Sequence, residues 1–431
     1  MNAPLPLKDA HGHALSGAAP AAIDLFENAC HELRCYIGDP LGSAQAALAQ
    51  APQMVMGHVL VAWLQLLGTE PTGLPEARAA LAAARALPRV NEREGMHLAA
   101  IEHLVQGRWH AAGALLEDLS IRYPRDALAL QAGHQIDFFT GHSRMLRDRI
   151  ARALPDWQAG MPGYHALLGM HAFGLEETGD YAAAERAGRR CVELERRDGW
   201  GWHAVAHVLE MQNRRREGTA WLRRDMAAWG EGSFFAVHNA WHLALFHLGL
   251  EEIDEVLAIV DERVLGPQSP VVLDMIDGSA MLWRLTLRGI PVGARWSALA
   301  DRWAAVTNAA EGGLYAFNDF HAMMAFVGAG RDADAARLLE AQQRTLQRGQ
   351  GDSVLFLREV GHDATRALHA FAGGDAAEAV RLLRPLRSQS HRFGGSHAQR
   401  DIIDLTLIAA ADKAGEAALA RALRHERSAR M

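Results

Sequence analysis

Four histidines in two pairs, His203 with His207 and His238 with His242, are the residues of this sequence whose types and spacing best suit chemistry. The members of each pair are four residues apart, so on an α-helix they lie above one another on one side. Glu210 follows His207 by three residues and shares its side. Imidazoles with a carboxylate bind zinc and other divalent ions, and they also move protons without a metal.

Three uses of these histidines stay open from the sequence. They could bind a metal, with Glu210 as an additional ligand or a base; they could catalyse or bind a ligand without metal; or they could be hydrogen-bonded structural residues. The spacing is similar to the histidine half of a zincin motif, without the glutamate directly after the first histidine. We expect a divalent metal, zinc first, with Glu210 as a catalytic residue and these metal ligands: His203, His207, His238 and His242.

A second polar motif is Asn318-Asp319-Phe320-His321. Asp319 could accept the ring proton of His321, which would set the tautomer and basicity of that imidazole. Alternatively, Asn318 or Asp319 caps the start of a helix. In the first case Asp319 and His321 would act with Glu210 as catalytic residues.

A third motif, residues 394–401, is a glycine-led entry to a helix, where backbone amides carry positive potential. Arg400 could hold a carboxylate or phosphate of a ligand there. Alternatively, Ser396 is only the N-cap, and Arg400 and Asp401 form an internal salt bridge. The residues expected to bind substrate are these: Asn239, Gln399, Arg400 and His58.

Asp274 and Asp277 place two carboxylates on one side of an otherwise apolar helical segment. Buried carboxylates are unfavourable unless they are paired. The sequence offers Arg284, Arg288 or a histidine of the site as partners.

The elements that must position these residues are helices joined by short turns. Turns headed by Gly or Asn recur 34, 38, 34 and 36 residues apart, at Gly107, Gly141, Gly179, Asn213 and Gly249. A helix-turn-helix period of about 34 residues is typical of tetratricopeptide repeats, which stack into a superhelix. The first helix of each pair lines its concave face. Residues 199–212 are predicted to be such a helix, with His203, His207 and Glu210 at positions that line the groove.

The chain also resembles the tetratricopeptide repeat protein 38 family, in five blocks that occur in the same order. They are Val55-Met-Gly-His58, residues 203–211, residues 238–244, residues 318–321 and residues 394–401. The resemblance implies a solenoid of degenerate tetratricopeptide-like helices and carries no activity with it. His165, His171 and His247 lie outside the blocks, and His397 departs from the polar residue expected there.

Composition excludes several classes of protein. The 431 residues are 49% hydrophobic, and their net charge of -7 with a pI near 6.3 argues against nucleic-acid binding. Three cysteines without a CxxC motif imply neither a disulfide framework nor a cysteine metal site. No GxGxxG, Walker or GxSxG motif is present, so we expect no nucleotide cofactor. We find no signal peptide or long apolar stretch, and expect a cytoplasmic protein without a membrane partner.

We therefore expect one all-helical domain over residues 1–431, with a flexible arm at about 1–20 and the clearest repeats at about 95–265. Residues 266–431 would be degenerate repeats or a helical cap. The favoured function is an enzyme acting on a small polar molecule, by metal-dependent hydrolysis or other acid/base chemistry. The alternative is a non-catalytic scaffold that binds a peptide or protein in its groove. An oligomer is compatible with either.

Overall fold

The computed structural model describes residues 6–309 and 315–430, and the regular structure in these residues is helical. Two isolated β-bridges, Lys8 with Ala14 and Ile37 with Ser233, are the exceptions within them. The predicted all-α class is confirmed. The chain forms two compact units: unit 1 comprises Met1–Phe138, Ser143–Val205 and Asp225–Ala236, and unit 2 comprises Phe139–His142, Ala206–Arg224 and Val237–Met431. The expectation of one continuous repeat domain stays a prediction.

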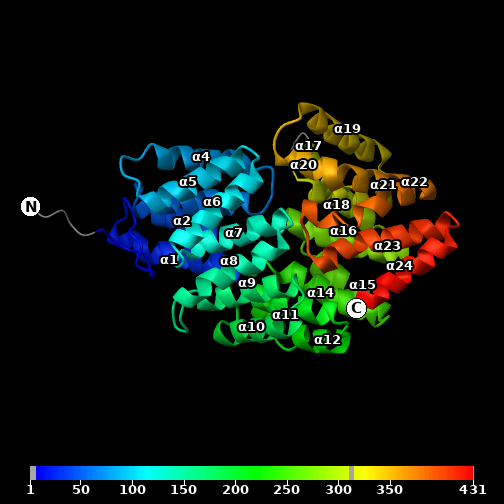
Figure 1. Ribbon diagram of the computed structural model, residues 1–431, viewed down its shortest axis with the longest axis horizontal. Coiled ribbons are helices and arrows are strands. Elements are labelled where there is room, and N and C mark those ends of the chain that lie inside the picture. Colours follow the sequence, from blue (N-terminus) through cyan, green and yellow to red (C-terminus); the bar gives the residue numbers. More distant parts are fainter. Residues whose placement is uncertain (1–5, 310–314, 431) are drawn as a thin grey trace, which may run out of the picture. The chain divides into compact units, whose positions relative to one another are not determined.

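Unit 1 is built from helical hairpins, of which α1 with α2, α3 with α4, α5 with α6 and α9 with α10 are the most closely packed (Figure 1). Helix α11 (Gly199–Met211) begins in unit 1 and ends in unit 2. The other helices of unit 1 are α1 (Pro20–Cys35), α2 (Pro40–Gln50), α3 (Val55–Leu66), α4 (Gly73–Arg85), α5 (Glu92–Val105), α6 (Trp109–Arg122), α7 (Ala127–Phe139), α8 (Ser143–Ala153), η1 (Leu154–Asp156), α9 (Tyr164–Glu176), α10 (Tyr181–Leu194) and α13 (Met226–Gly230).

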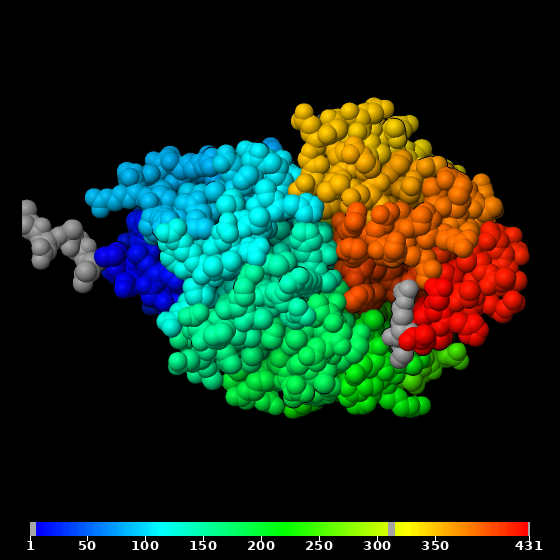
Figure 2. All heavy atoms as spheres, viewed as in Figure 1, coloured from blue at the N-terminus to red at the C-terminus, as the bar shows by residue number. Residues whose placement is uncertain are grey.

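In unit 2 the first helices of successive hairpins form an inner layer, in which α16 packs on α18 and α23, and α21 packs on α18 and α23. Helices α17, α19, α22 and α24 pair with them, and Figure 2 shows the last helices, orange to red, as one continuous surface. The helices are α12 (Arg215–Arg223), α14 (Ala236–Gly249), α15 (Ile253–Ile259), η2 (Val260–Val264), α16 (Val272–Leu287), α17 (Arg295–Ala309), α18 (Ala316–Gly328), α19 (Asp332–Arg348), α20 (Asp352–Phe356), η3 (Leu357–Gly361), α21 (His362–Ala372), α22 (Ala376–Leu386), η4 (Ser390–Phe393), α23 (His397–Lys413) and α24 (Ala417–Arg430).

The predicted turns join the paired helices. Gly107, Gly141, Gly179 and Asn213 have φ angles of 73°, 71°, 87° and 58°, the left-handed conformation that ends a helix and reverses the chain. At the fifth turn Gly249 is still helical, and Glu251 has the positive φ angle of 63° instead.

One backbone hydrogen bond recurs at these turns. At Gly179, the next amide, that of Asp180, donates to the Leu175 carbonyl five residues earlier, at 2.9 Å. This is the bond of the Schellman motif. The same bond closes the turns after Gly107, Asn213, Glu251, Gly289, Gly330, Gly374 and Gly415. Hairpins with one kind of turn therefore continue through the C-terminal third.

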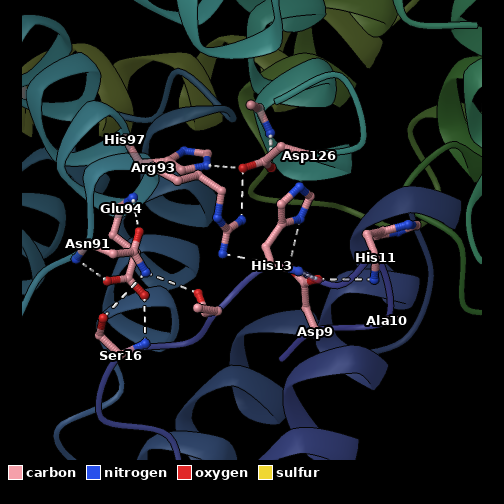
Figure 3. A network of polar contacts seen from close by, with 12 residues as sticks. Asp9, Ala10, His11, His13, Ser16, Asn91, Arg93, Glu94, His97 and Asp126 are labelled. Atoms are coloured by element: carbon pink, nitrogen blue, oxygen red, sulfur yellow. Dashed lines mark hydrogen bonds and ion pairs between the residues drawn. The ribbon is translucent and has the colours of Figure 1, made fainter. Parts of the chain in front are cut away.

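Residues 6–19, expected to be part of a flexible arm, belong to unit 1 and contact its helices; residues 1–5 are outside the described chain. Figure 3 shows their contacts: the Ser16 amide donates to Glu94 at 2.8 Å, and the Arg93 guanidinium lies 3.6 Å from Asp9. Arg93 also donates to Asp126 at 2.8 Å. These partners of the arm lie on a distant helix of the sequence, so the composition of the arm did not reveal them.

Tryptophan side chains fill the cores of both units. Trp63, Trp202 and Trp229 in unit 1, and Trp241 and Trp303 in unit 2, are less than 2% exposed. No helix among the described residues is long and apolar enough to cross a membrane.

The left-handed turns are a testable requirement of the fold. An added Cβ at Gly179 would meet no atom within 4 Å, so Gly179→Ala tests the positive φ angle alone. We expect this change to lower the free energy of unfolding by about 1 kcal/mol, measured by urea denaturation.

Gly95 is the matched control, because it also has open space around it but lies inside α5 without a positive φ angle. Gly95→Ala should raise the free energy of unfolding by up to about 1 kcal/mol. Equal effects of the two changes would contradict the role of the turn.

Candidate functional site

Three histidines meet in unit 2, on α11 and α14. His207, His238 and His242 each offer a ring nitrogen, and these nitrogens lie within 4.8 Å of one another. The ring of His242 is the central one, with centroids 4.5 Å from His207 and 4.9 Å from His238. The predicted histidine cluster is therefore present.

His203 precedes His207 by one turn of the same helix and so lies on the same side of α11. It is the fourth predicted ligand, and it belongs to unit 1, where its ring contacts aromatic side chains. It stacks on Phe173 with centroids 5.4 Å apart and lies 4.9 Å from Trp200. Only 3% of His203 is exposed.

A carboxylate of α16 fixes the orientation of His238. The Nδ1 of His238 lies 2.8 and 2.9 Å from the two carboxylate oxygens of Asp277, which is 1% exposed. Since Asp277 accepts the Nδ1 proton, the ring lone pair lies on Nε2, the nitrogen that a metal would use. A buried carboxylate here needs a partner, and of the candidates in the sequence, Arg284, Arg288 or a histidine of the site, it is the histidine that pairs with Asp277.

Burial keeps the two inner histidines neutral. His207 and His242 are fully buried, and loss of solvation lowers the pKa of each imidazole well below its usual value. The neighbouring His238, and the positive charge of Arg400 near His207 and of Arg284 near His242, lower the pKa further. Neutral imidazoles carry the lone pairs that metal binding requires.

The start of α23 and the middle of α16 supply positive charge around the cluster. Arg284 donates to the Ala398 carbonyl at 2.7 Å, and its guanidinium lies 5.4 Å from the centre of the Trp241 ring. Burial lowers the pKa of Arg284 to about 10, so it stays charged at neutral pH. His397 lies near enough to lower the pKa of His207. Neither Arg284 nor His397 was among the expected site residues, because only the packing of α23 on α16 brings them here.

Glu210 lies one turn after His207, at the end of α11. Burial raises the pKa of its carboxyl group, and nearby Asp401 adds to the rise, while Arg215 opposes it. No hydrogen bond from the described residues reaches its buried Oε2. A carboxyl group in this state can exchange a proton more readily near neutral pH than an exposed one.

The expected pairing of Asp319 with His321 does not form. The Nδ1 of His321 donates to the Phe317 carbonyl at 2.8 Å, and Asp319 accepts a hydrogen bond from Gln342 of α19 at 3.0 Å. The capping alternative is also wrong, because the N-cap of α18 is Tyr315, Asp319 lies within the first turn, and no side chain forms a capping hydrogen bond. Gln342 lies on another helix, so the residues next to Asp319 in the sequence could not reveal this partner.

His321 itself is fully buried, and burial lowers the pKa of its ring to about 3. Its role as a catalytic residue stays a prediction, as does that of Asp319.

The motif at the start of α23 mainly caps the N-terminus of that helix. Ser396 is the N-cap, and its side chain and that of Gln399 form a capping box, with bonds of 3.3 and 3.0 Å. Arg400 donates to the Gly395 carbonyl. Asp401 pairs with Arg427 of α24 at 2.7 Å, and not with Arg400 as the alternative supposed. A substrate role for Gln399 and Arg400 remains a prediction, and the capping box occupies Gln399.

The other two expected substrate residues differ in their placement. Asn239 is fully buried on α14, next to His238. His58 lies on α3 of unit 1, and its Nε2 bonds to the Pro52 carbonyl at 2.9 Å. His58 is therefore not part of the cluster in unit 2.

No protein-family model matches the chain. Among solved structures it is similar to human IFIT1 in a dimer with m7Gppp-AAAA, at 12% identity and a TM-score of 0.39, covering 94% of each chain. It is also similar to yeast Tom70, at 10% identity and a TM-score of 0.39, covering 90% of this chain and 89% of that one. The TPR domain of P58(IPK) has 13% identity and a TM-score of 0.21, covering 92% and 99%.

The buried histidines predict that acid destabilises the metal-free protein. The unfolded chain takes up protons at His207 and His242 below a pH of about 6.5, while the folded protein does not. Each residue should therefore lower the free energy of unfolding by up to roughly 1.4 kcal/mol per pH unit below about pH 6.5. Urea denaturation with a chelator at pH 7.0 and pH 5.5 measures the loss.

His207→Gln removes one of these groups and should reduce the pH dependence, whatever it does to stability at pH 7.0. His369→Gln, an exposed histidine of α21, should leave the dependence unchanged. Equal pH dependence in the His207→Gln and wild-type proteins would show that His207 is not kept neutral.

Proposed function

We propose that unit 2 binds a divalent cation, zinc first, through His207, His238 and His242; the fourth expected ligand, His203, belongs to unit 1 and is not part of this proposal. The Asp277–His238 hydrogen bond is the observation that carries this proposal. Histidines that bind metals almost always donate their second ring proton to a carboxylate, carbonyl or water. Here the carboxylate is buried, lies on a third helix and has both of its oxygens in contact with one ring nitrogen.

The ligand types and their spacing in the cluster also suit a zinc ion. Three imidazoles suit zinc, and nitrogens within 4.8 Å of one another need only small side-chain movements to share an ion. A zinc ion held by three protein ligands supplies an acidified water and a Lewis acid.

The residues around such a metal site would suit the hydrolysis of a small, negatively charged molecule. Glu210 would accept and return a proton, because burial already favours its protonated form. Arg284 and Arg400 would hold an anionic group beside the cluster. The expected enzyme is thus a metal-dependent hydrolase, and small polar substrates fit it better than polymers because the inner histidines are buried.

A non-catalytic scaffold is the second candidate, and the repeated hairpins support it directly. Helical repeats of this kind stack to form binding surfaces for peptides or proteins. Such surfaces usually repeat similar polar groups from unit to unit, whereas the unlike titratable groups here gather in one cluster. Membership of the tetratricopeptide repeat protein 38 family, proposed from the five sequence blocks, is compatible with both functions.

Metal analysis of purified protein tests the first proposal. We expect His238→Gln to lose about one equivalent of zinc relative to wild type, because it removes a ligand from the partly exposed edge of the cluster. Asp277→Asn should weaken zinc binding by about 10- to 100-fold, since the amide cannot orient the ring in the same way. Plasma emission spectrometry and competition with a zinc-binding dye measure the two effects.

His369→Gln is the control for both variants and should keep the full metal content. Circular dichroism must show that the variants remain helical. Unchanged zinc content in folded His238→Gln and in a folded His238→Gln/His242→Gln double variant would overturn the metal proposal.

A screen of ester, amide and phosphoester substrates separates the enzyme from the scaffold. If the protein is a hydrolase, Glu210→Gln should abolish the activity found and retain zinc, because Glu210 moves a proton in this scheme. Turnover at wild-type rates by Glu210→Gln would exclude that role. A metal-loaded protein that hydrolyses nothing in the screen and captures a specific peptide would favour the scaffold.

A further inference from the structure

A second group of metal-binding side chains lies in unit 1, outside the cluster of unit 2. His31 and Cys35 are four residues apart at the end of α1, and His165 lies near the start of α9. One ligand atom from each lies within 4.8 Å of the others. The two imidazole rings meet edge to face, with centroids 6.3 Å apart.

A buried carboxylate orients one of the two histidines. The Nδ1 of His165 lies 2.7 Å from Oδ2 of Asp198, and Asp198 is fully buried. The second oxygen, Oδ1, accepts the Gly201 amide at 2.9 Å at the start of α11. Asp198 is thus committed to accepting hydrogen bonds, and its contact with His165 places the ring lone pair on Nε2.

The distances within the group are close to those that a shared ion requires. The Cys35 sulfur lies 3.8 and 3.9 Å from the two ring nitrogens of His31. In a tetrahedral zinc site, bonds of about 2.3 Å to sulfur and about 2.0 Å to nitrogen place those two ligand atoms roughly 3.6 Å apart. A small turn of the His31 ring would bring one nitrogen to that distance.

We propose that unit 1 holds a zinc ion bound by the Cys35 sulfur and by one ring nitrogen each of His31 and His165. Asp198 is the positioning residue, in the same relation to His165 as Asp277 is to His238. His31 is half-buried and the side chain of His165 is 11% exposed, so the site is open on one side. A water molecule can therefore supply the fourth ligand.

Binding at this site must release one proton. Burial raises the pKa of the Cys35 thiol, so without a cation the sulfur carries its proton; zinc takes the thiolate and the proton passes to solvent. His31 requires no such loss, because burial lowers the pKa of its ring and it is already neutral at pH 7. Asp198 and Glu195 place negative charge near the sulfur, which favours a cation there, while Arg34 opposes it.

The sequence offered no sign of this site. Cys35 has no neighbouring cysteine, and His165 lies far along the chain from it, outside every block of the family resemblance. Only the packing of unit 1 brings α1, α9 and the start of α11 together.

Cobalt substitution tests the proposal independently of the site in unit 2. Metal-free, full-length protein is titrated with Co²⁺ under reducing conditions and its ultraviolet–visible spectrum is recorded. A thiolate bound to Co²⁺ gives a charge-transfer band in the near ultraviolet, whereas a site of imidazoles alone gives none. We expect one equivalent of Co²⁺ to produce this band, and Zn²⁺ to remove it.

The single variants Cys35→Ala and His165→Gln should each abolish the band or weaken Co²⁺ binding at this site at least tenfold. In both variants the Co²⁺ signal from the unit 2 site should persist. Cys30→Ala is the matched control, a buried cysteine of the same helix, and should keep the band. His238→Gln should also keep it, so failure of one site is distinguishable from failure of the other. No thiolate band in wild type, or an undiminished band in folded Cys35→Ala, would overturn the proposal.

Discussion

Hydrogen bonds from imidazole to carboxylate are the interaction on which the polar interior of this protein depends. Helical repeats bury one face of nearly every helix, and a charged group there is unfavourable unless it is paired. Three buried carboxylates meet this condition through a histidine: Asp126 with His97, Asp198 with His165 and Asp277 with His238. In each pair the carboxylate lies on a different helix from the histidine, or at the start of one, so the bond also joins elements.

The three pairs differ in what the second ring nitrogen does. At His97 the Trp63 indole donates to Nδ1 at 3.1 Å, so both nitrogens serve the packing of unit 1. The adjoining contacts of Arg93 hold the first residues of the described chain in place (Figure 3). Burial opposes ionisation of Asp126, but His97 and Arg93 outweigh it and hold the pKa of its carboxyl group below the usual range. At His165 and His238 the carboxylate instead directs a lone pair toward other potential metal ligands.

The repeat architecture explains why these groups gather. In unit 2 several hairpins end their first helix with the same left-handed turn, and the first helices α16, α18, α21 and α23 pack on one another. The residues of the candidate site in unit 2 lie on such first helices: α11, α14, α16 and α23. The positive charge of Arg400, far away in the sequence, therefore lowers the pKa of His207. Second helices such as α10 and α22 carry surface ion pairs, Arg189 with Glu185 and Arg381 with Glu378, which contribute little to stability individually.

The sequence by itself determined the all-α class, the positions of the turns and the two histidine pairs. These features are local: helix periodicity, glycine at positive φ angles and a spacing of four residues all act within one or two turns of chain. The N-cap at Ser396, one of the two alternatives for its motif, is local in the same way. Tertiary structure alone decided the partners of the buried polar groups. It assigned Asp277 to His238, Asp319 to Gln342 and Asp401 to Arg427, and it brought Cys35 to His165. Each of these contacts joins different helices, and a side chain's own neighbours in sequence do not specify which distant helix will cover it.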